Sequence, residues 1–330
     1  MKTAVFSSHK FERPFLEHSN GEKHELLFID ARLTKETSVF ANGCTAVSLF
    51  VSDDASEKVL TYLHGAGIRF IVLRSAGFNN VDIRKAKELG MRVARVPAYS
   101  PYAVAEHTVA LMLGLNRKLV RAHNRITEGN FSLEGLTGFD MNGKVAGILG
   151  TGKIGSIVAK ILSAFGCTLI GYDRYPNEEL VKNYGMKYTD FETVCKNADI
   201  ISLHTPLNDE TRYLIKRNSI DLMKPGVMLI NTSRGGLVNT KDVIAGLKTG
   251  KIGYFGMDVY EEEEGLFFED HSEDILQDDV IARLMTFKNV LITSHQAFLT
   301  KTALENIADT TIHNLDNFEK NLDSPNEIIL

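Results

Sequence analysis

The chain has 330 residues, of which 44% are hydrophobic and 24% are charged, and its formal net charge is −5. This length suffices for two domains with separate cores, and the composition is that of an ordinary globular protein. The small net charge and the lack of a stripe rich in lysine and arginine argue against nucleic acid or an anionic membrane as a partner. We therefore expect a small-molecule ligand.

Neither a targeting segment nor a metal site is expected. The N-terminus lacks the apolar core of a signal peptide, and no run approaches the roughly twenty apolar residues that span a bilayer. The three cysteines, Cys44, Cys167 and Cys195, are far apart and match neither a disulfide framework nor a metal-ligand spacing. We expect them to be packing residues in a reducing cytoplasm.

The first hundred residues alternate short apolar runs with helical patterns. The runs predict strands at residues 3–6, 26–29, 47–51, 70–73 and 92–96, and the periodic stretches predict helices at 57–63 and 82–89. This βαβ alternation favours a parallel sheet in a domain of its own. Ser100 and Pro101 then suit the N-cap and first position of a long helix that passes Leu115 and leads into a second domain.

A glycine-rich turn, Gly150-Thr151-Gly152-Lys153-Ile154-Gly155, follows an apolar run at residues 145–149. Apolar residues recur at helical spacing beyond it, and Gly166 would end that helix. A strand, a glycine turn and a helix in this order are typical of a dinucleotide site, where the free N–H groups at the helix start hold phosphates. The alternatives are a turn that merely ends a strand, or a site for FAD or S-adenosylmethionine.

An acidic residue, Asp173, ends the next apolar run, about twenty residues past the turn. Its carboxylate can accept hydrogen bonds from both ribose hydroxyls of an adenosine and would repel a 2′-phosphate, which favours NAD over NADP. The neighbouring Arg174 complicates this interpretation, because an arginine near this position can serve a 2′-phosphate.

The alternation resumes beyond the turn and predicts strands at residues 168–172, 200–204, 227–231, 255–259 and 290–294, with a helix at 241–247. An amphipathic stretch at 303–318 predicts a last helix, whose domain the pattern leaves open. Ligands bind at the carboxyl ends of strands in such sheets. The polar residues at these ends are His204, Thr205 and Pro206; Asn231, Thr232, Ser233 and Arg234; Asp258 with Glu261, Glu262, Glu263 and Glu264; and Ser294 with His295.

Reduction of a carbonyl by a nicotinamide cofactor needs a cation for the substrate carboxylate, a proton donor, and a group that keeps this donor charged. Arg234 can hold a carboxylate through two parallel hydrogen bonds. His295 can donate a proton near neutral pH, and a carboxylate from residues 261–264 could stabilise its imidazolium. Each residue alone has an ordinary structural explanation, but their common placement favours a catalytic group.

Three segments, residues 145–155 with Asp173, 198–207 and 223–236, resemble the signatures of the D-isomer-specific 2-hydroxyacid dehydrogenases. The resemblance covers nearly the whole chain. It implies a catalytic triad of Arg234, Glu263 and His295, in which the glutamate stands five residues after the aspartate of Asp258-Val259-Tyr260. The expected cofactor contacts are Gly150, Gly152, Lys153, Ile154, Gly155, Asp173, His204, Thr205, Pro206, Thr232, Ser233 and Asp258, the last on the nicotinamide side.

The resemblance also implies a domain organisation. An NAD-binding Rossmann domain, residues 101–298, would be inserted into a flavodoxin-like catalytic domain formed by residues 1–100 and 299–330. Within the latter, the backbone amides of Ala76 and Gly77 are expected to bind the substrate carboxylate, and Tyr99 to line the substrate pocket.

The segment from His295 through Thr300, with Phe298 as a pocket residue, resembles the D-lactate-forming branch of the family. This implies reversible reduction of pyruvate to D-lactate by NADH, with His295 as general acid and base, Glu263 as its partner and Arg234 orienting the substrate. Two alternatives are the same chemistry on a bulkier 2-oxo acid, such as phenylpyruvate or 2-oxoisocaproate, and a protein that senses NADH without turnover. The family further implies a homodimer or homotetramer.

Overall fold

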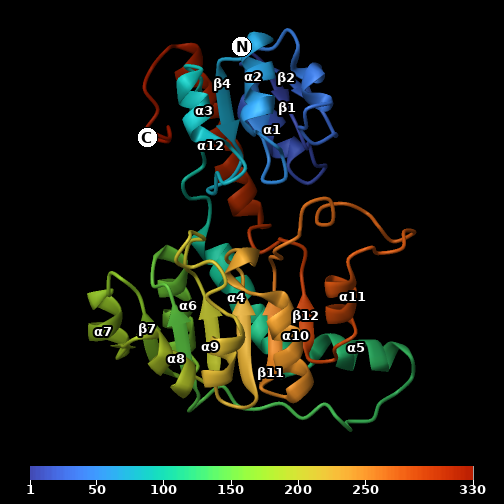
Figure 1. Ribbon diagram of the computed structural model, residues 1–330, viewed down its shortest axis with the longest axis vertical. Coiled ribbons are helices and arrows are strands. Elements are labelled where there is room, and N and C mark those ends of the chain that lie inside the picture. Colours follow the sequence, from blue (N-terminus) through green and yellow to red (C-terminus); the bar gives the residue numbers. More distant parts are fainter. Residues whose placement is uncertain (330) are drawn as a thin grey trace. The chain divides into compact units, whose positions relative to one another are not determined.

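The computed structural model describes residues 1–329, which form two compact units (Figure 1). The discontinuous unit comprises Met1–Ser100 and the chain from Leu299 onward, and the central unit comprises Pro101–Phe298. Each unit is built on one sheet whose described strands are all parallel. The predicted fold class, two parallel-sheet α/β domains, is therefore confirmed.

The discontinuous unit has a five-stranded sheet in the order β2-β1-β3-β4-β5, which is the flavodoxin-like order. Helices α2 and α3 cover one face, and α12 packs Ile312, Leu315 and Phe318 against the other. The C-terminal helix thus belongs to this sheet. The elements are β1 (Lys2–Val5), α1 (Arg13–Asn20), β2 (Glu25–Phe28), the 3-10 helix η1 (Thr37–Ala41), β3 (Ala46–Leu49), α2 (Glu57–Gly65), β4 (Phe70–Leu73), α3 (Ile83–Glu88), β5 (Arg92–Ala94) and α12 (Lys301–Glu319).

The central unit has a seven-stranded sheet in the order β12-β11-β10-β9-β6-β7-β8. Helices α4 and α6 cover one face, and α8, α9 and α10 cover the other. Its elements are α4 (Pro101–Asn116), α5 (Leu119–Thr127), β6 (Val145–Leu149), α6 (Lys153–Ala164), β7 (Thr168–Tyr172), α7 (Glu178–Tyr184), β8 (Lys187–Tyr188), α8 (Phe191–Asn197), β9 (Ile200–Leu203), α9 (Arg217–Leu222), β10 (Val227–Asn231), η2 (Gly235–Leu237), α10 (Thr240–Thr249), β11 (Ile252–Met257), α11 (Asp279–Met285) and β12 (Val290–Ile292).

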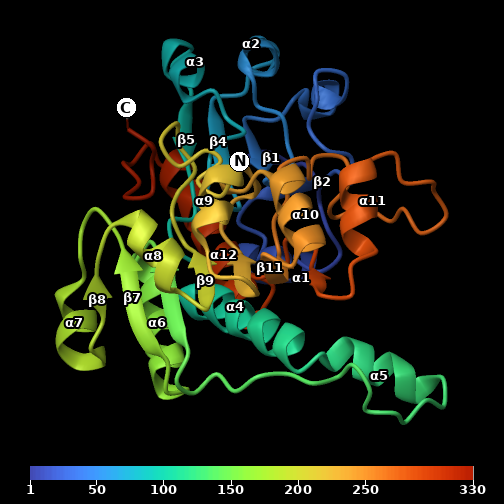
Figure 2. The same cartoon turned by 60° about the horizontal axis from the view of Figure 1, so that its bottom comes forward.

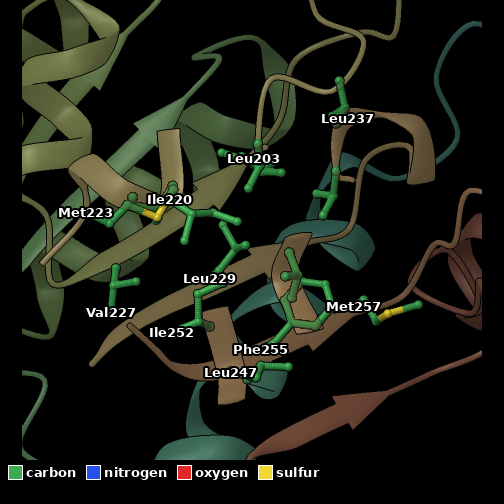
Figure 3. Close-up of a cluster of buried hydrophobic side chains, with 14 of the residues drawn as sticks. Leu203, Ile220, Met223, Val227, Leu229, Leu237, Leu247, Ile252, Phe255 and Met257 are labelled. Atoms are coloured by element: carbon green, nitrogen blue, oxygen red, sulfur yellow. The ribbon is translucent and has the colours of Figure 1, made fainter. Parts of the chain in front are cut away.

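Strand β10 shows why the middle of the central sheet needs unbroken apolar runs. Side chains alternate between the faces of a strand, so a strand covered on both faces has no polar side. Leu229 points into the core cluster against α9 and α10 (Figure 3), whereas Met228 and Ile230 belong to the cluster against α4 and α6. This packing determines where each strand ends, and the polar residues follow directly after those ends.

The predicted strands are all present, with shifts at their ends that affect the site. Strand β11 ends at Met257 and β12 at Ile292, so Asp258 and Thr293 lie in the loops that follow rather than in the strands. Helices α1, α5, α7, α8, α9 and α11 and the two-residue strand β8 were not predicted, because their segments are short or largely polar.

No helix within residues 1–329 is both long and apolar enough to cross a membrane. The same residues contain no group of three or more His, Cys, Asp and Glu side chains that could hold a metal ion. All three cysteines are buried free thiols.

Candidate active site

The carboxyl ends of five adjacent parallel strands meet at one edge of the central sheet. Strands β12, β11, β10, β9 and β6 are neighbours in this order, and all run in the same direction. Every polar residue that the sequence placed after these strands therefore lies along this edge. The glycine turn follows β6, and the segments with Arg234, Glu263 and His295 follow β10, β11 and β12.

In the glycine turn, backbone segments lie in direct contact because no Cβ atom separates them. A Cβ atom at Gly155 would lie 2.0 Å from the carbonyl oxygen of Gly150, and one at Gly150 would lie 2.7 Å from the carbonyl carbon of His204. A Cβ at Gly152 would meet no described atom within 4 Å, so this position faces open space at the start of α6. The turn is thus packed on one side and open on the side where a pyrophosphate would approach the free N–H groups of α6.

Asp173 is fixed against the glycine turn. One carboxylate oxygen accepts hydrogen bonds from the backbone N–H (2.5 Å) and the hydroxyl (3.1 Å) of Thr151, and the other accepts from the N–H of Tyr175 (2.8 Å). The neighbouring Arg174 forms an exposed ion pair with Glu210. The fixed negative charge of Asp173 is the feature at this position that would repel a 2′-phosphate.

Thr205 supports the assignment of this edge to a polar cofactor. Its hydroxyl oxygen is buried and makes no hydrogen bond within residues 1–329, and a buried unpaired hydroxyl is unfavourable unless a ligand satisfies it. Its carbonyl accepts a hydrogen bond from the Ser233 hydroxyl (2.8 Å). Lys153 and Ile154 form the first turn of α6. The unpaired Thr205 hydroxyl and the open start of α6 therefore provide hydrogen-bonding groups that a dinucleotide could use.

The His204 ring lies in a buried environment. Burial lowers its pKa to about 3, so the imidazole is neutral at physiological pH, and Nε2 lies 2.8 Å from the Ser202 hydroxyl. The ring therefore has a packing role beside the glycine turn, while Pro206 is exposed. Cofactor contacts from these two residues stay predictions.

His295 and Glu263 form a hydrogen-bonded pair. Nδ1 of His295 lies 3.0 Å from Oε1 of Glu263, whose Oε2 accepts the N–H of Tyr260 (3.1 Å). Glu261, from the same acidic run, instead accepts the N–H of Thr240. Nε2 of His295 makes no hydrogen bond with the described residues, so this nitrogen is available to a substrate.

The surroundings of Glu263 keep its carboxylate charged. Burial alone would raise its pKa, but the hydrogen bond and charge of His295, the N–H of Tyr260 and the positive charge of Arg234 together hold this pKa below its ordinary value. A carboxylate that is ionised at neutral pH can stabilise an imidazolium at His295.

Arg234 is positioned by its backbone. Asn231 donates from its side-chain amide to the carbonyl of Arg234 (2.9 Å) and accepts the N–H of Ser233 (3.1 Å). A Cβ atom at Gly235 would lie 2.1 Å from the carbonyl oxygen of Tyr260, so only glycine permits this approach to the segment that carries Glu263. The positioning role of Asn231 was not predicted, although its polar side chain at the end of an apolar run was noted.

Asp258 is fully buried, and both its carboxylate oxygens accept hydrogen bonds from backbone N–H groups, those of Gln296 and Ala297 (2.8 Å each). A contact of Asp258 with the nicotinamide therefore stays a prediction. Thr232, another predicted cofactor contact, pairs through its hydroxyl with Thr108 of α4 (2.7 Å).

The loop after β4 in the discontinuous unit presents two backbone donors. The carbonyls of Ala76 and Gly77 accept hydrogen bonds from Arg95 (2.8 Å) and the Ser75 hydroxyl (2.7 Å), whereas their N–H groups make none within residues 1–329. Tyr99, in the same unit, is half-buried, and its carbonyl accepts the side-chain amide of Asn306 (2.6 Å).

A buried ion pair that sequence reasoning missed anchors the start of this loop. Arg74 donates to both carboxylate oxygens of Glu12 (2.9 and 3.1 Å) and to the carbonyl of Phe6 (2.7 Å), beyond β1. Both side chains are almost completely buried. The loop after β4 is therefore tied to the turn after β1.

Comparison with known proteins decides the family. The model for the D-isomer specific 2-hydroxyacid dehydrogenase NAD binding domain matches residues 109–297. Over 330 residues, all of both chains, the sequence is 50% identical to D-lactate dehydrogenase from Escherichia coli. The chain belongs to the D-isomer-specific 2-hydroxyacid dehydrogenase family. The apo structure of the Escherichia coli enzyme matches this dehydrogenase with a TM-score of 0.91 at 48% identity, over the whole of both chains.

Two more distant solved structures bear on the ligands. D-lactate dehydrogenase from Aquifex aeolicus, complexed with NAD and lactic acid, covers 97% of this chain and 96% of its own, with a TM-score of 0.86 at 33% identity. A D-2-hydroxyisocaproate dehydrogenase covers 99% of both chains, with a TM-score of 0.85 at 27% identity. The predicted family and its cofactor, NAD, are confirmed.

We expect Asp173→Ser to lower the preference for NADH over NADPH, measured as the ratio of kcat/KM, by about tenfold or more, because the change removes both an acceptor for the ribose and a charge that repels a 2′-phosphate. Adding Glu210→Ala should lower the ratio further by releasing Arg174. The exposed Asp323→Ser is the control. An unchanged ratio in Asp173→Ser would mean that this carboxylate does not bind the ribose hydroxyls.

Proposed function

We propose that this dehydrogenase is an NADH-dependent D-lactate dehydrogenase, which reduces pyruvate to D-lactate reversibly. The observation that carries the proposal is the His295–Glu263 hydrogen bond, which holds Nδ1 and leaves Nε2 available to a substrate. The full-length identity of 50% to the Escherichia coli D-lactate dehydrogenase supports the choice of substrate.

The proposed proton transfer uses His295. NADH, when bound at the glycine turn, supplies the hydride to the carbonyl carbon. His295 donates the proton on Nε2 to the carbonyl oxygen, and Glu263 stabilises the imidazolium before the transfer. In the reverse direction, Nε2 accepts the proton of the lactate hydroxyl. The charged state of Glu263 suits this role.

Substrate orientation is assigned to Arg234 and to two backbone amides. The guanidinium of Arg234 would hold the carboxylate of pyruvate, and the N–H groups of Ala76 and Gly77 would donate to it. Tyr99 and Phe298 are assigned to the substrate pocket. On this basis residues 1–100 and 299–330 form the catalytic domain, and residues 101–298 form the NAD-binding domain.

We expect His295→Gln to lower kcat for pyruvate reduction by about a thousandfold, because general acid catalysis contributes roughly this much. The Kd of NADH, measured by fluorescence titration, should stay within about twofold, since this role does not involve cofactor binding. The exposed His313→Gln on α12 is the control. Turnover by His295→Gln at the parent rate would contradict the proton-donor role.

The substrate is tested by comparing kcat/KM for pyruvate, 2-oxoisocaproate and phenylpyruvate, with chiral analysis of the product. We expect the highest value for pyruvate and a D-configured product. A clear preference for a bulkier 2-oxo acid would reassign the substrate. Tight NADH binding without oxidation by any of them would favour a sensor of NADH.

We also infer a homodimer or homotetramer. Helix α5 has no buried residue, and Leu119, Val120 and Ile126 are 56%, 54% and 54% exposed. Phe131 and Leu133, in the segment after it, are 76% and 82% exposed. Figures 1 and 2 show α5 extending away from the sheet of the central unit. A cluster of exposed apolar side chains is typical of an interface, here with a second copy of the chain.

Light scattering should give the mass of a dimer or tetramer for the parent, and Val120→Glu with Ile126→Glu should shift the protein toward monomer, because charges would be buried in the interface. A parent protein that is monomeric at micromolar concentration would contradict the inference.

The buried free cysteines favour a reducing compartment, and we propose a fermentative reaction in the cytoplasm.

A further inference from the structure

The turn that carries His295 is held by a single buried residue. The Asp258 carboxylate accepts hydrogen bonds from the Thr293 hydroxyl (2.6 Å) and from the N–H groups of Gln296 and Ala297 (2.8 Å each). The Asp258 carbonyl accepts the N–H of His295 (2.7 Å). Asp258 is fully buried, so water does not compete for these bonds.

This anchoring holds His295 in an unfavourable backbone conformation. Its φ of 47° lies in the left-handed region, which residues other than glycine rarely adopt and which persists only where the surroundings enforce it. The hydrogen bonds to Asp258 lie on both sides of this residue. They therefore determine the direction in which the imidazole leaves the backbone.

A second histidine extends the network to α4. Nε2 of His107 lies 3.0 Å from the Thr293 hydroxyl and 3.5 Å from the Asp258 carboxylate. The only hydroxyl proton of Thr293 is donated to Asp258, so the hydroxyl oxygen must accept from His107. Burial lowers the pKa of His107, although the charge of Asp258 opposes this, so the neutral ring with its proton on Nε2 is the donor.

We propose that His107 is a positioning residue for the reaction: through Thr293 and Asp258 it holds the turn of residues 293–297 so that His295 is aimed at Glu263 and the substrate. The proposal rests on the proposed function. In this scheme His107 acts through Thr293, to which its Nε2 is hydrogen-bonded, and has no direct part in the proton transfer by His295. Its place in the middle of α4 ties the catalytic turn to the helix that packs beneath β10, β11 and β12.

Two matched pairs of variants test the proposal. Thr293→Val removes the hydroxyl at nearly constant size and Thr293→Ser keeps it, while His107→Leu removes the donor and His107→Gln keeps one. With pyruvate and NADH, we expect Thr293→Val and His107→Leu to lower kcat about tenfold, since small displacements of a reacting group are costly. Their Kd for NADH should stay within about twofold, and Thr293→Ser and His107→Gln should retain most of the activity.

Hydrogen exchange provides a readout that does not depend on turnover. The amides of Gln296 and Ala297 should exchange about tenfold faster in Thr293→Val and His107→Leu than in the parent, with exchange in α6 unchanged. His313→Leu on the surface of α12 is the control. If Thr293→Val fails to fold, the His107 pair carries the test.

The proposal is overturned if Thr293→Val and His107→Leu keep the parent kcat, if the conservative variants are equally impaired, or if exchange at residues 296–297 is unchanged. A lower melting temperature with unchanged kcat would likewise show a purely structural role. A parent protein that reduces no 2-oxo acid would instead refute the proposed function, and the exchange rates would still report on the network.

Discussion

The hydrogen bond between His295 and Glu263 is the interaction on which the proposed chemistry depends. The two residues come from loops that follow β12 and β11, and they meet because these adjacent strands are parallel and end at the same edge. The bond occupies Nδ1, leaves Nε2 without a hydrogen bond to the described residues and gives the imidazolium a negative partner. Arg234, from the loop after β10, adds a positive charge that helps to keep Glu263 ionised. The proposed proton donor, its counter-charge and the cation proposed to bind the substrate carboxylate thus come from three neighbouring strand ends.

Close approach of bare backbone makes this assembly possible. Gly155 and Gly150 bring α6 against the end of β6, and Gly235 brings the Arg234 segment against the carbonyl of Tyr260. Any side chain at these positions would push the strand-end loops apart. Buried polar groups then fix the loops in place, with Asp258 holding the His295 turn and Asn231 holding the Arg234 turn. The side chains to which we assign the reaction are therefore held by neighbours to which we assign no part in it.

Local pattern was sufficient to predict the strands, the glycine turn and the polar residues at the strand ends, because each depends on residues close together in the sequence. It could not choose among the glutamates of residues 261–264, since an acidic run has no period that singles out one member, and family resemblance selected Glu263. It also missed His107 and the Arg74–Glu12 pair. Their partners lie far away in sequence, 186 residues for His107 and Thr293 and 62 for Arg74 and Glu12, so only the tertiary fold brings them together.

The most direct test of this account is kcat for pyruvate reduction in the parent and in Glu263→Gln, measured beside the Kd of NADH. In the proposed mechanism His295 donates the proton to the carbonyl oxygen, and the negative charge of Glu263 stabilises the donor. The change to Gln keeps the size and a hydrogen-bonding oxygen but removes this charge, so we expect kcat to fall about tenfold or more while the Kd of NADH stays within about twofold. A Glu263→Gln variant with the parent kcat would contradict the claim that this carboxylate sustains the proton donor.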